Sequence, residues 1–492
     1  MFDLNRRSLL GAGIATSTAM AAKAHADMPM TSQDSERFWQ QVASQFDATR
    51  EVIHLENGNW GMMPRPVRDA YIAHLDRVNR DTSYYGRRGM GRDMAAVRDR
   101  LARVMAVPAE EIAFTRNATE ALKALIGGYN QLKPGDVILY ANLDYDSMQG
   151  AMEGLARKAE AQCVTLTLPQ PATRQSLIDA YAEAFNAHPR LKLVLLTHLS
   201  HRTGLVLPVR EIAALARARG IDVIVDAAHS WRQLDFDLAD LDCDFVGLNG
   251  HKWLAAPLGV GILHIRQSAL HKIDRDISAN IEGPETIGQR LGTGTLNGAA
   301  FLTVPAALDF DEAIGLPLKA KRLRDLRDRW VHQVADIPQI EVLTPNDPAL
   351  YGAITSFRLR GNDGPAATED LARRLLEQHR IFTVARDMGA VAASVLRPPC
   401  SIQWRTWMPS RGPCARWFRF FEQGLRVYGS TVTHLKNHCY IAVFASSLSL
   451  HGRCLAVGPS HSGRGLHAYF GHQDNVAGGG CGPVALCGSG VC

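Results

Sequence analysis

The chain has 492 residues, of which 46% are hydrophobic, with 54 Lys and Arg against 49 Asp and Glu. This length predicts two or three domains, and the composition excludes collagen-like, disordered and coiled-coil proteins. Beyond the N-terminus no apolar run is long enough to span a bilayer as a helix, so we expect no stable membrane anchor. Residues 389–492 hold nine Lys or Arg, two acidic residues and seven of the nine cysteines. Because this tail carries the positive excess, we expect no nucleic-acid partner.

The N-terminus resembles an export signal. Arg6 and Arg7 precede a weakly apolar stretch, and Ala24 and Ala26 are the small residues that signal peptidase recognises before its cut. The arginine pair followed by Ser-Leu-Leu resembles a twin-arginine signal. We therefore expect cleavage after Ala26, passage through the twin-arginine export machinery and a periplasmic location.

Short apolar runs alternate with amphipathic stretches between about residues 100 and 300. The runs, which predict buried strands, cover residues 136–140, 191–197, 222–225, 244–248 and 259–265. Residues 147–161 and 208–219 have helical periodicity, and Gly220 ends the second helix. This alternation predicts an α/β domain whose mostly parallel sheet is covered by helices on both faces.

From about residue 305 the pattern predicts a smaller α+β domain. We expect a charged helix over 319–334, strands over 340–343 and 354–358, a helix over 368–379 and a strand over 381–385. The predicted organisation is a signal peptide (1–26), an N-terminal segment (27–60), a large domain (61–304), a small C-terminal domain (305–388) and a tail (389–492).

Three motifs follow predicted strands, at the carboxyl edge where open α/β sheets bind ligands. Asp226 stands in Val-Asp-Ala-Ala-His-Ser, Lys252 stands in Asn-Gly-His-Lys-Trp, and Thr-Arg-Asn-Ala-Thr-Glu opens a helix at Ala118. A lysine can form an imine with an aldehyde cofactor, and a carboxylate can keep a pyridine nitrogen protonated. The start of a helix can bind a phosphate on its free N–H groups. These three properties are what pyridoxal 5′-phosphate (PLP) requires.

In this order, the motifs resemble those of the class V aminotransferases, a family of fold-type I PLP enzymes, over roughly residues 50–390. The resemblance implies that Lys252 forms the Schiff base, Asp226 partners the pyridine nitrogen and His229 lies near the phenolic oxygen. The other implied cofactor contacts are Ala118, Thr119, Asn249 and His251 at the phosphate, Tyr145 on the ring, and Thr295, beside Gly294, reaching the phosphate from the other subunit. The last contact implies a homodimer with shared active sites. No metal site is expected.

Several further residues lie near these motifs. Trp60 stands in Glu-Asn-Gly-Asn-Trp-Gly, which resembles the N-terminal substrate loop of the family, and Thr203 and Gly204 match its Thr-Gly turn. A core or surface position is the competing interpretation for both Tyr145 and Trp60. His198 and His201 flank the cofactor region as candidates for substrate contact.

The resemblance does not decide which reaction follows removal of the α-proton from an external aldimine. The sequences around Trp60, Asp226 and Lys252 look most like the isopenicillin-N-epimerase-like branch, which implies an amino acid or a peptidyl amino-acid metabolite as substrate. An aminotransferase and an exported enzyme of siderophore maturation are the alternatives. Cysteine desulfurase is disfavoured because no cysteine lies between Lys252 and Cys400. A non-catalytic binding protein with a PLP-enzyme fold stays open because of the tail.

The tail departs from the family pattern. Residues 393–415 contain several prolines, show no periodicity and lack the Arg-x-Ser/Thr-Pro pattern that binds the substrate carboxylate in the family. From the third base of the Ala393 codon, allowed codons permit VRVTPALFNTVEDMDALARALR, which contains that pattern followed by an amphipathic helix. We therefore interpret residues 389–492 as an out-of-frame, unpacked tail, and we expect this chain to bind PLP with little turnover.

Overall fold

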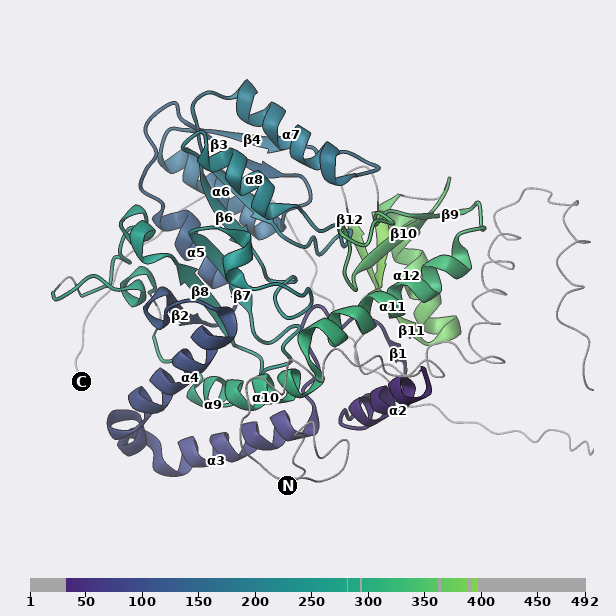
Figure 1. Ribbon diagram of the computed structural model, residues 1–492, viewed down its shortest axis with the longest axis horizontal. Helices are drawn as coiled ribbons and strands as arrows, with labels where there is room; N and C mark the ends of the chain where they lie inside the picture. The colour runs from purple at the N-terminus through teal and green to yellow at the C-terminus, as the bar shows by residue number, and fades with distance from the viewer. Residues whose placement is uncertain (1–31, 281, 293, 362–363, 388–391, 397–492) are drawn as a thin grey trace, which may run out of the picture. The chain divides into compact units, whose positions relative to one another are not determined.

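The computed structural model describes residues 32–387 and 392–396, except residues 281, 293 and 362–363. The predicted signal peptide and residues 397–492 of the predicted tail lie outside the described residues. Within the described part, no helix is long and apolar enough to cross a membrane. Figure 1 shows a large sheet surrounded by helices and a second, smaller sheet that packs with α12.

The large sheet has seven strands in the order β2, β8, β7, β6, β5, β3, β4. These are β2 (Ile112–Thr115), β3 (Val137–Ala141), β4 (Gln162–Leu166), β5 (Leu191–Thr197), β6 (Asp222–Asp226), β7 (Phe245–Asn249) and β8 (Gly261–Ile265). The strands from β7 to β4 pair in parallel, which confirms the predicted fold class. Strand β8 runs antiparallel to both β7 and β2. Residues 250–260 contain no helix, so they do not make the crossover that a parallel pair needs.

Helices cover both faces of this sheet, because its strands are apolar on both sides. Leu139 and Ala141 of β3 join one buried cluster, whereas Ile138 and Tyr140 join the cluster on the opposite face. The helices are α3 (Arg65–Arg88), α4 (Met90–Met105), α5 (Ala118–Gly128), α6 (Asp146–Lys158), α7 (Arg174–Ala187), α8 (Val209–Arg217), α9 (Gly298–Leu302) and α10 (Val304–Ile314). Helices α3, α9 and α10 lie side by side (Figure 1). Gly220, with φ of +68°, follows α8 as the predicted stop.

The small sheet has the order β12, β13, β10, β9, and all of its pairs are antiparallel. Its elements are α11 (Leu316–Val334), β9 (Ile340–Val342), β10 (Thr355–Leu359), α12 (Pro365–His379), β12 (Val384–Asp387) and β13 (Ala392–Leu396). The single strand predicted over residues 381–385 is divided in two at Thr383. Its first part, β11 (Ile381–Phe382), pairs in parallel with β1 (Ile53–His54), which follows α2 (Ser32–Ala43). The N-terminal segment therefore contacts the C-terminal part of the fold.

The prediction that the tail is unpacked from residue 389 is wrong for β13. This strand pairs with β10, where Thr355 lies opposite Leu396, and with β12, where Val384 lies opposite Val395. Strand pairing uses backbone N–H and C=O groups, so a short apolar stretch can complete a sheet even where the family motif is missing. The folded part of the chain therefore extends at least to residue 396.

Candidate active site

A cavity of about 880 Å³ opens at the carboxyl ends of the parallel strands. All predicted cofactor contacts except Thr295 line it, namely Ala118, Thr119, Tyr145, Asp226, His229, Asn249, His251 and Lys252. Thr295 is exposed and does not line the cavity of its own chain. The fold therefore brings together residues that are up to 134 positions apart in the sequence.

Lys252 lies in direct contact with His229. The distance from Lys252 Nζ to His229 Nε2 is 2.9 Å, and the indole N–H of Trp253 donates to His229 Nδ1 at 3.4 Å. Because Nδ1 accepts a hydrogen bond, this network assigns the proton of a neutral His229 to Nε2, from which it can be donated to the lysine nitrogen. The amine of a lysine attacks an aldehyde only in its uncharged form.

Asp226 ends β6 and is only 6% exposed. Its Oδ1 accepts a hydrogen bond of 2.9 Å from the backbone N–H of Ala228. Burial raises the pKa of Asp226, and this hydrogen bond together with the positive charge of Lys252 acts against the rise. A cationic nitrogen placed beside this carboxylate would stabilise its ionised form.

The start of α5 forms a polar cradle at one end of the cavity. The side chain of Asn117 caps the helix by accepting from the N–H of Glu120, and the N–H of Ala118 donates to Asn249 Oδ1 at 2.8 Å. Within the described part of the chain, the N–H of Thr119 has no acceptor. A side chain at Gly261 would overlap the backbone of Asn117, so the glycine permits the close approach of β8 to this helix start.

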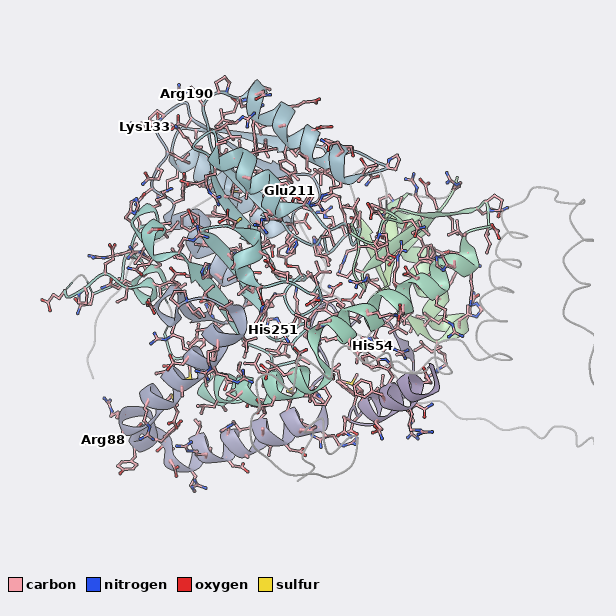
Figure 2. The ribbon with its side chains drawn as sticks, in the orientation of Figure 1. His54, Arg88, Lys133, Arg190, Glu211 and His251 are labelled. Atoms are coloured by element: carbon pink, nitrogen blue, oxygen red, sulfur yellow. The ribbon has the colours of Figure 1, made fainter. Side chains whose placement is uncertain are left out.

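His251 lines the same cavity and is held by contacts with the backbone. Its Nδ1 donates to the carbonyl oxygen of Val260 at 2.9 Å, and burial lowers its pKa (His251 is labelled in Figure 2). Its own carbonyl oxygen accepts from the N–H of Gly61 at 2.7 Å. A side chain at Gly61 would overlap the carbonyl of Lys252, so the loop over residues 56–61 packs directly on the lysine segment.

The two candidate histidines after β5 have different environments. His201 lines the cavity, meets the Tyr145 ring edge-on at 5.3 Å and lies nearly parallel to the His229 ring at 6.3 Å. His198 does not line it. That side chain packs edge-on against Phe236, and burial lowers its pKa to about 4. Only His201 is therefore placed to contact a ligand.

The cavity also contains charged residues that the sequence motifs did not single out. They are Asp146, Arg202 and Arg386. Arg202 follows β5 at the same sheet edge as Asp226 and Lys252, so its position after an apolar strand was a usable signal. Arg386 lies in a strand of the small sheet, and no motif marks it. Trp60 is 53% exposed, and its neighbour Asn59 lines the cavity instead.

Two further buried acidic residues do not line the cavity. Asp144 accepts from the N–H of Ala141 at 2.8 Å, and burial, together with the negative charge of Asp226, raises its pKa to about 7. Asp311 is 2% exposed and binds two cations, Arg232 (Nε to Oδ2, 2.7 Å) and Lys319 (Nζ to Oδ1, 2.6 Å). Lys319 also donates to the carbonyl oxygen of Trp253, so this cluster fixes the backbone beside Lys252.

The model of the family described as aminotransferase class-V matches residues 63–396. The chain therefore belongs to this family. It is 30% identical over 361 residues to the isopenicillin N epimerase of Streptomyces clavuligerus, a match that covers 70% of this chain and 89% of that protein. It is also 28% identical over 329 residues to a probable cysteine desulfurase of Synechocystis sp., covering 63% of this chain and 76% of that protein.

Solved structures show the same fold at lower identity. The apo cysteine desulfurase of Thermococcus onnurineus NA1 has a TM-score of 0.65 and 20% identity, and the match covers 79% of this chain and 98% of that one. A C-DES variant with glycine covalently linked to its PLP cofactor has a TM-score of 0.63 and 22% identity, covering 73% and 95%. These likenesses confirm the predicted fold-type I architecture.

Proposed function

We propose that this class V PLP enzyme removes and returns the α-proton of an amino acid or a peptidyl amino-acid metabolite, as an isopenicillin-N-epimerase-like enzyme. The observation that carries the proposal is the contact between Lys252 Nζ and His229 Nε2 in the cavity that Asp226 also lines. The 30% identity to two isopenicillin N epimerases supports the choice of this branch.

The lining residues suit PLP. Lys252 would hold its aldehyde carbon, Asp226 its ring nitrogen, and the start of α5 with Asn249 and His251 its phosphate. When bound, PLP withdraws electrons from the substrate and so acidifies the α-C–H bond. Tyr145 and His201 form the wall against which the flat ring would pack.

The residues around Lys252 supply the proton chemistry. Its amine is the base that we expect to take the α-proton, and Nε2 of His229, at 2.9 Å, holds this amine in position. Asp226 is 6% exposed, so little water screens its carboxylate and its negative charge would act strongly on the ring nitrogen of bound PLP. The cluster around Asp311 keeps the segment after Lys252 from shifting.

Cysteine desulfurase remains the disfavoured interpretation, although relatives of that name match the chain. The described residues contain two free cysteines, Cys163 and Cys243, and neither lines the cavity. In both, burial raises the pKa of the thiol, to about 11 in Cys163 and about 12 in Cys243. A reactive thiolate requires the opposite shift.

The test combines covalent trapping with isotope exchange. Borohydride reduction of the protein loaded with PLP should fix the cofactor on Lys252, and amino acids in D₂O should gain deuterium at Cα with inversion of configuration, slowly in this chain because its tail lacks the Arg-x-Ser/Thr-Pro pattern. Lys252→Ala should abolish both results, whereas the exposed control Lys321→Ala should change neither. Trapping on another lysine would contradict the site, and formation of a keto acid without inversion at Cα would show an aminotransferase.

We also propose a homodimer in which Thr295 reaches the partner's active site. The exposure of Gly294 and Thr295, away from the cavity of their own chain, supports this arrangement. Sedimentation should give a dimer, and Thr295→Trp should weaken PLP binding without unfolding the chain. A monomer that binds PLP normally would refute the shared site.

A further inference from the structure

We propose that Arg202 and Arg386 form an arginine subsite that binds a second carboxylate of the substrate, beyond the α-carboxylate of an amino acid. The inference rests on the proposed function, because the subsite belongs to the same cavity. Arg202 comes from the turn after β5 of the large sheet, and Arg386 comes from β12 of the small sheet. Both arginines therefore line one cavity from separate parts of the fold.

The turn that carries Arg202 is held by several hydrogen bonds and by close packing. Ser200 Oγ accepts from the N–H of Arg202 at 3.2 Å, and the N–H of Gly204 donates to the carbonyl of Ser200 at 3.0 Å. Gly204 has φ of +76°, and a side chain there would overlap the carbonyl of Ile354. Thr344 Oγ1 donates to the carbonyl of Thr203. The backbone of Arg202 is thus held before a ligand arrives, which lowers the entropic cost of binding.

Arg202 forms an ion pair with Asp146, an acidic side chain that a substrate carboxylate can replace. Arg202 is 8% exposed and pairs with Asp146, whose side chain is 71% exposed. Because the Asp146 carboxylate is mostly hydrated, its pairing contributes little stability, and moving it into water costs little. A substrate carboxylate can therefore take its place against the buried guanidinium.

Arg386 provides a second donor. Its Nε atom is buried and has no hydrogen-bond partner, and no carboxylate pairs with it, among the residues that the structure describes. A buried donor without an acceptor is costly, and a bound anion would remove that cost. A guanidinium presents parallel N–H groups that match the two oxygens of a carboxylate, and neither arginine belongs to the α5 cradle expected to hold the phosphate.

These features indicate the class of substrate. An acidic amino acid, or a peptidyl metabolite with an acidic side chain, would place its second carboxylate between the two arginines. The volume of the cavity lies in the range of sites that hold drug-sized ligands, so it leaves room for such a side chain beside the cofactor.

The experiment compares a dicarboxylate with a monocarboxylate, using the full chain loaded with PLP and isothermal titration. Wild type should bind glutarate more tightly than butyrate. Arg202→Met and Arg386→Met should each weaken glutarate binding roughly 10- to 100-fold, the effect of losing one charge-assisted contact, and should leave butyrate within about twofold. Asp146→Asn should tighten glutarate binding severalfold, because it removes the competing carboxylate. The control Arg373→Met removes one exposed charge from α12 and should change neither affinity.

Three results would overturn the subsite. The first is unchanged glutarate binding in both arginine variants. The second is equal weakening of glutarate and butyrate binding, which would assign the arginines to the α-carboxylate. The third is weaker glutarate binding in Asp146→Asn. Trapping of PLP on Lys252 is measured in the same samples. If trapping and Cα exchange succeed while these binding results fail, the subsite is wrong and the proposed function stands.

Discussion

Asp311→Asn should destabilise the protein strongly, although Asp311 does not line the cavity. Asp311 is the shared acceptor of Arg232 and Lys319, and all three residues are at least nine-tenths buried. Asparagine keeps one acceptor oxygen but presents an NH₂ group and no charge to the other cation. Removing one partner of a buried ion pair costs about 3–5 kcal/mol, because the remaining charge is left uncompensated.

Asp309→Asn is a matched control two residues earlier in the same helix. Its side chain is 69% exposed, and its pair with Arg100 at 3.1 Å should contribute at most about 1 kcal/mol. We take an unfolding entropy of about 2.1 cal/mol/K for each residue that the structure describes. On this basis Tm should fall by roughly 4–7 °C in Asp311→Asn and by about 1 °C or less in the control. Calorimetry of both variants measures this difference. Equal Tm values would show that the Asp311 cluster is not a compensated buried network.

Three further predictions follow from other features. Asp144→Asn should be more stable than wild type at pH 8 by up to a few kcal/mol, and this advantage should vanish towards pH 4. The reason is that Asp144, with a pKa of about 7 in the folded chain and 3.8 ordinarily, loses its proton more easily in the unfolded chain. Urea denaturation at a series of pH values measures the difference. Gly61→Val should abolish trapping of PLP on Lys252, since the added side chain meets the lysine carbonyl, and retained trapping would contradict this packing. Replacing Arg6 and Arg7 by Lys should keep the uncleaved protein in the cytosol, and a processed periplasmic form would exclude the twin-arginine route.

The strands and the cofactor motifs were predictable because each depends on local sequence. The run over residues 191–197 coincides with β5, and Asp226 and Lys252 follow strands whose carboxyl ends meet at one edge. A strand that is buried on both faces is apolar along its length, so it can be recognised without knowing which strands pair with it. The cavity residues on these strand ends could therefore be named before their contacts were known.

Other features depend on tertiary contacts that leave no local pattern. The antiparallel direction of β8 depends on its pairing with β2 and β7, and β13 is a strand because β10 and β12 offer it backbone partners. Arg386 enters the cavity only because the small sheet packs beside it. The raised pKa of Asp144 comes from burial that its motif does not encode.

The pairing of β1 with β11 also sets an order of events during synthesis. Ile53 lies opposite Ile381, so about 330 residues must leave the ribosome after β1 before β11 becomes available to pair with it. At roughly 5–20 residues per second the wait lasts about 16–66 s, long enough for the large domain to fold first. During that time β1 has no strand partner, although the loop that follows it can already contact the lysine segment through the hydrogen bond from the N–H of Gly61 to the carbonyl of His251. Forming the β1–β11 pair is therefore a late step that depends on a contact of very high sequence separation.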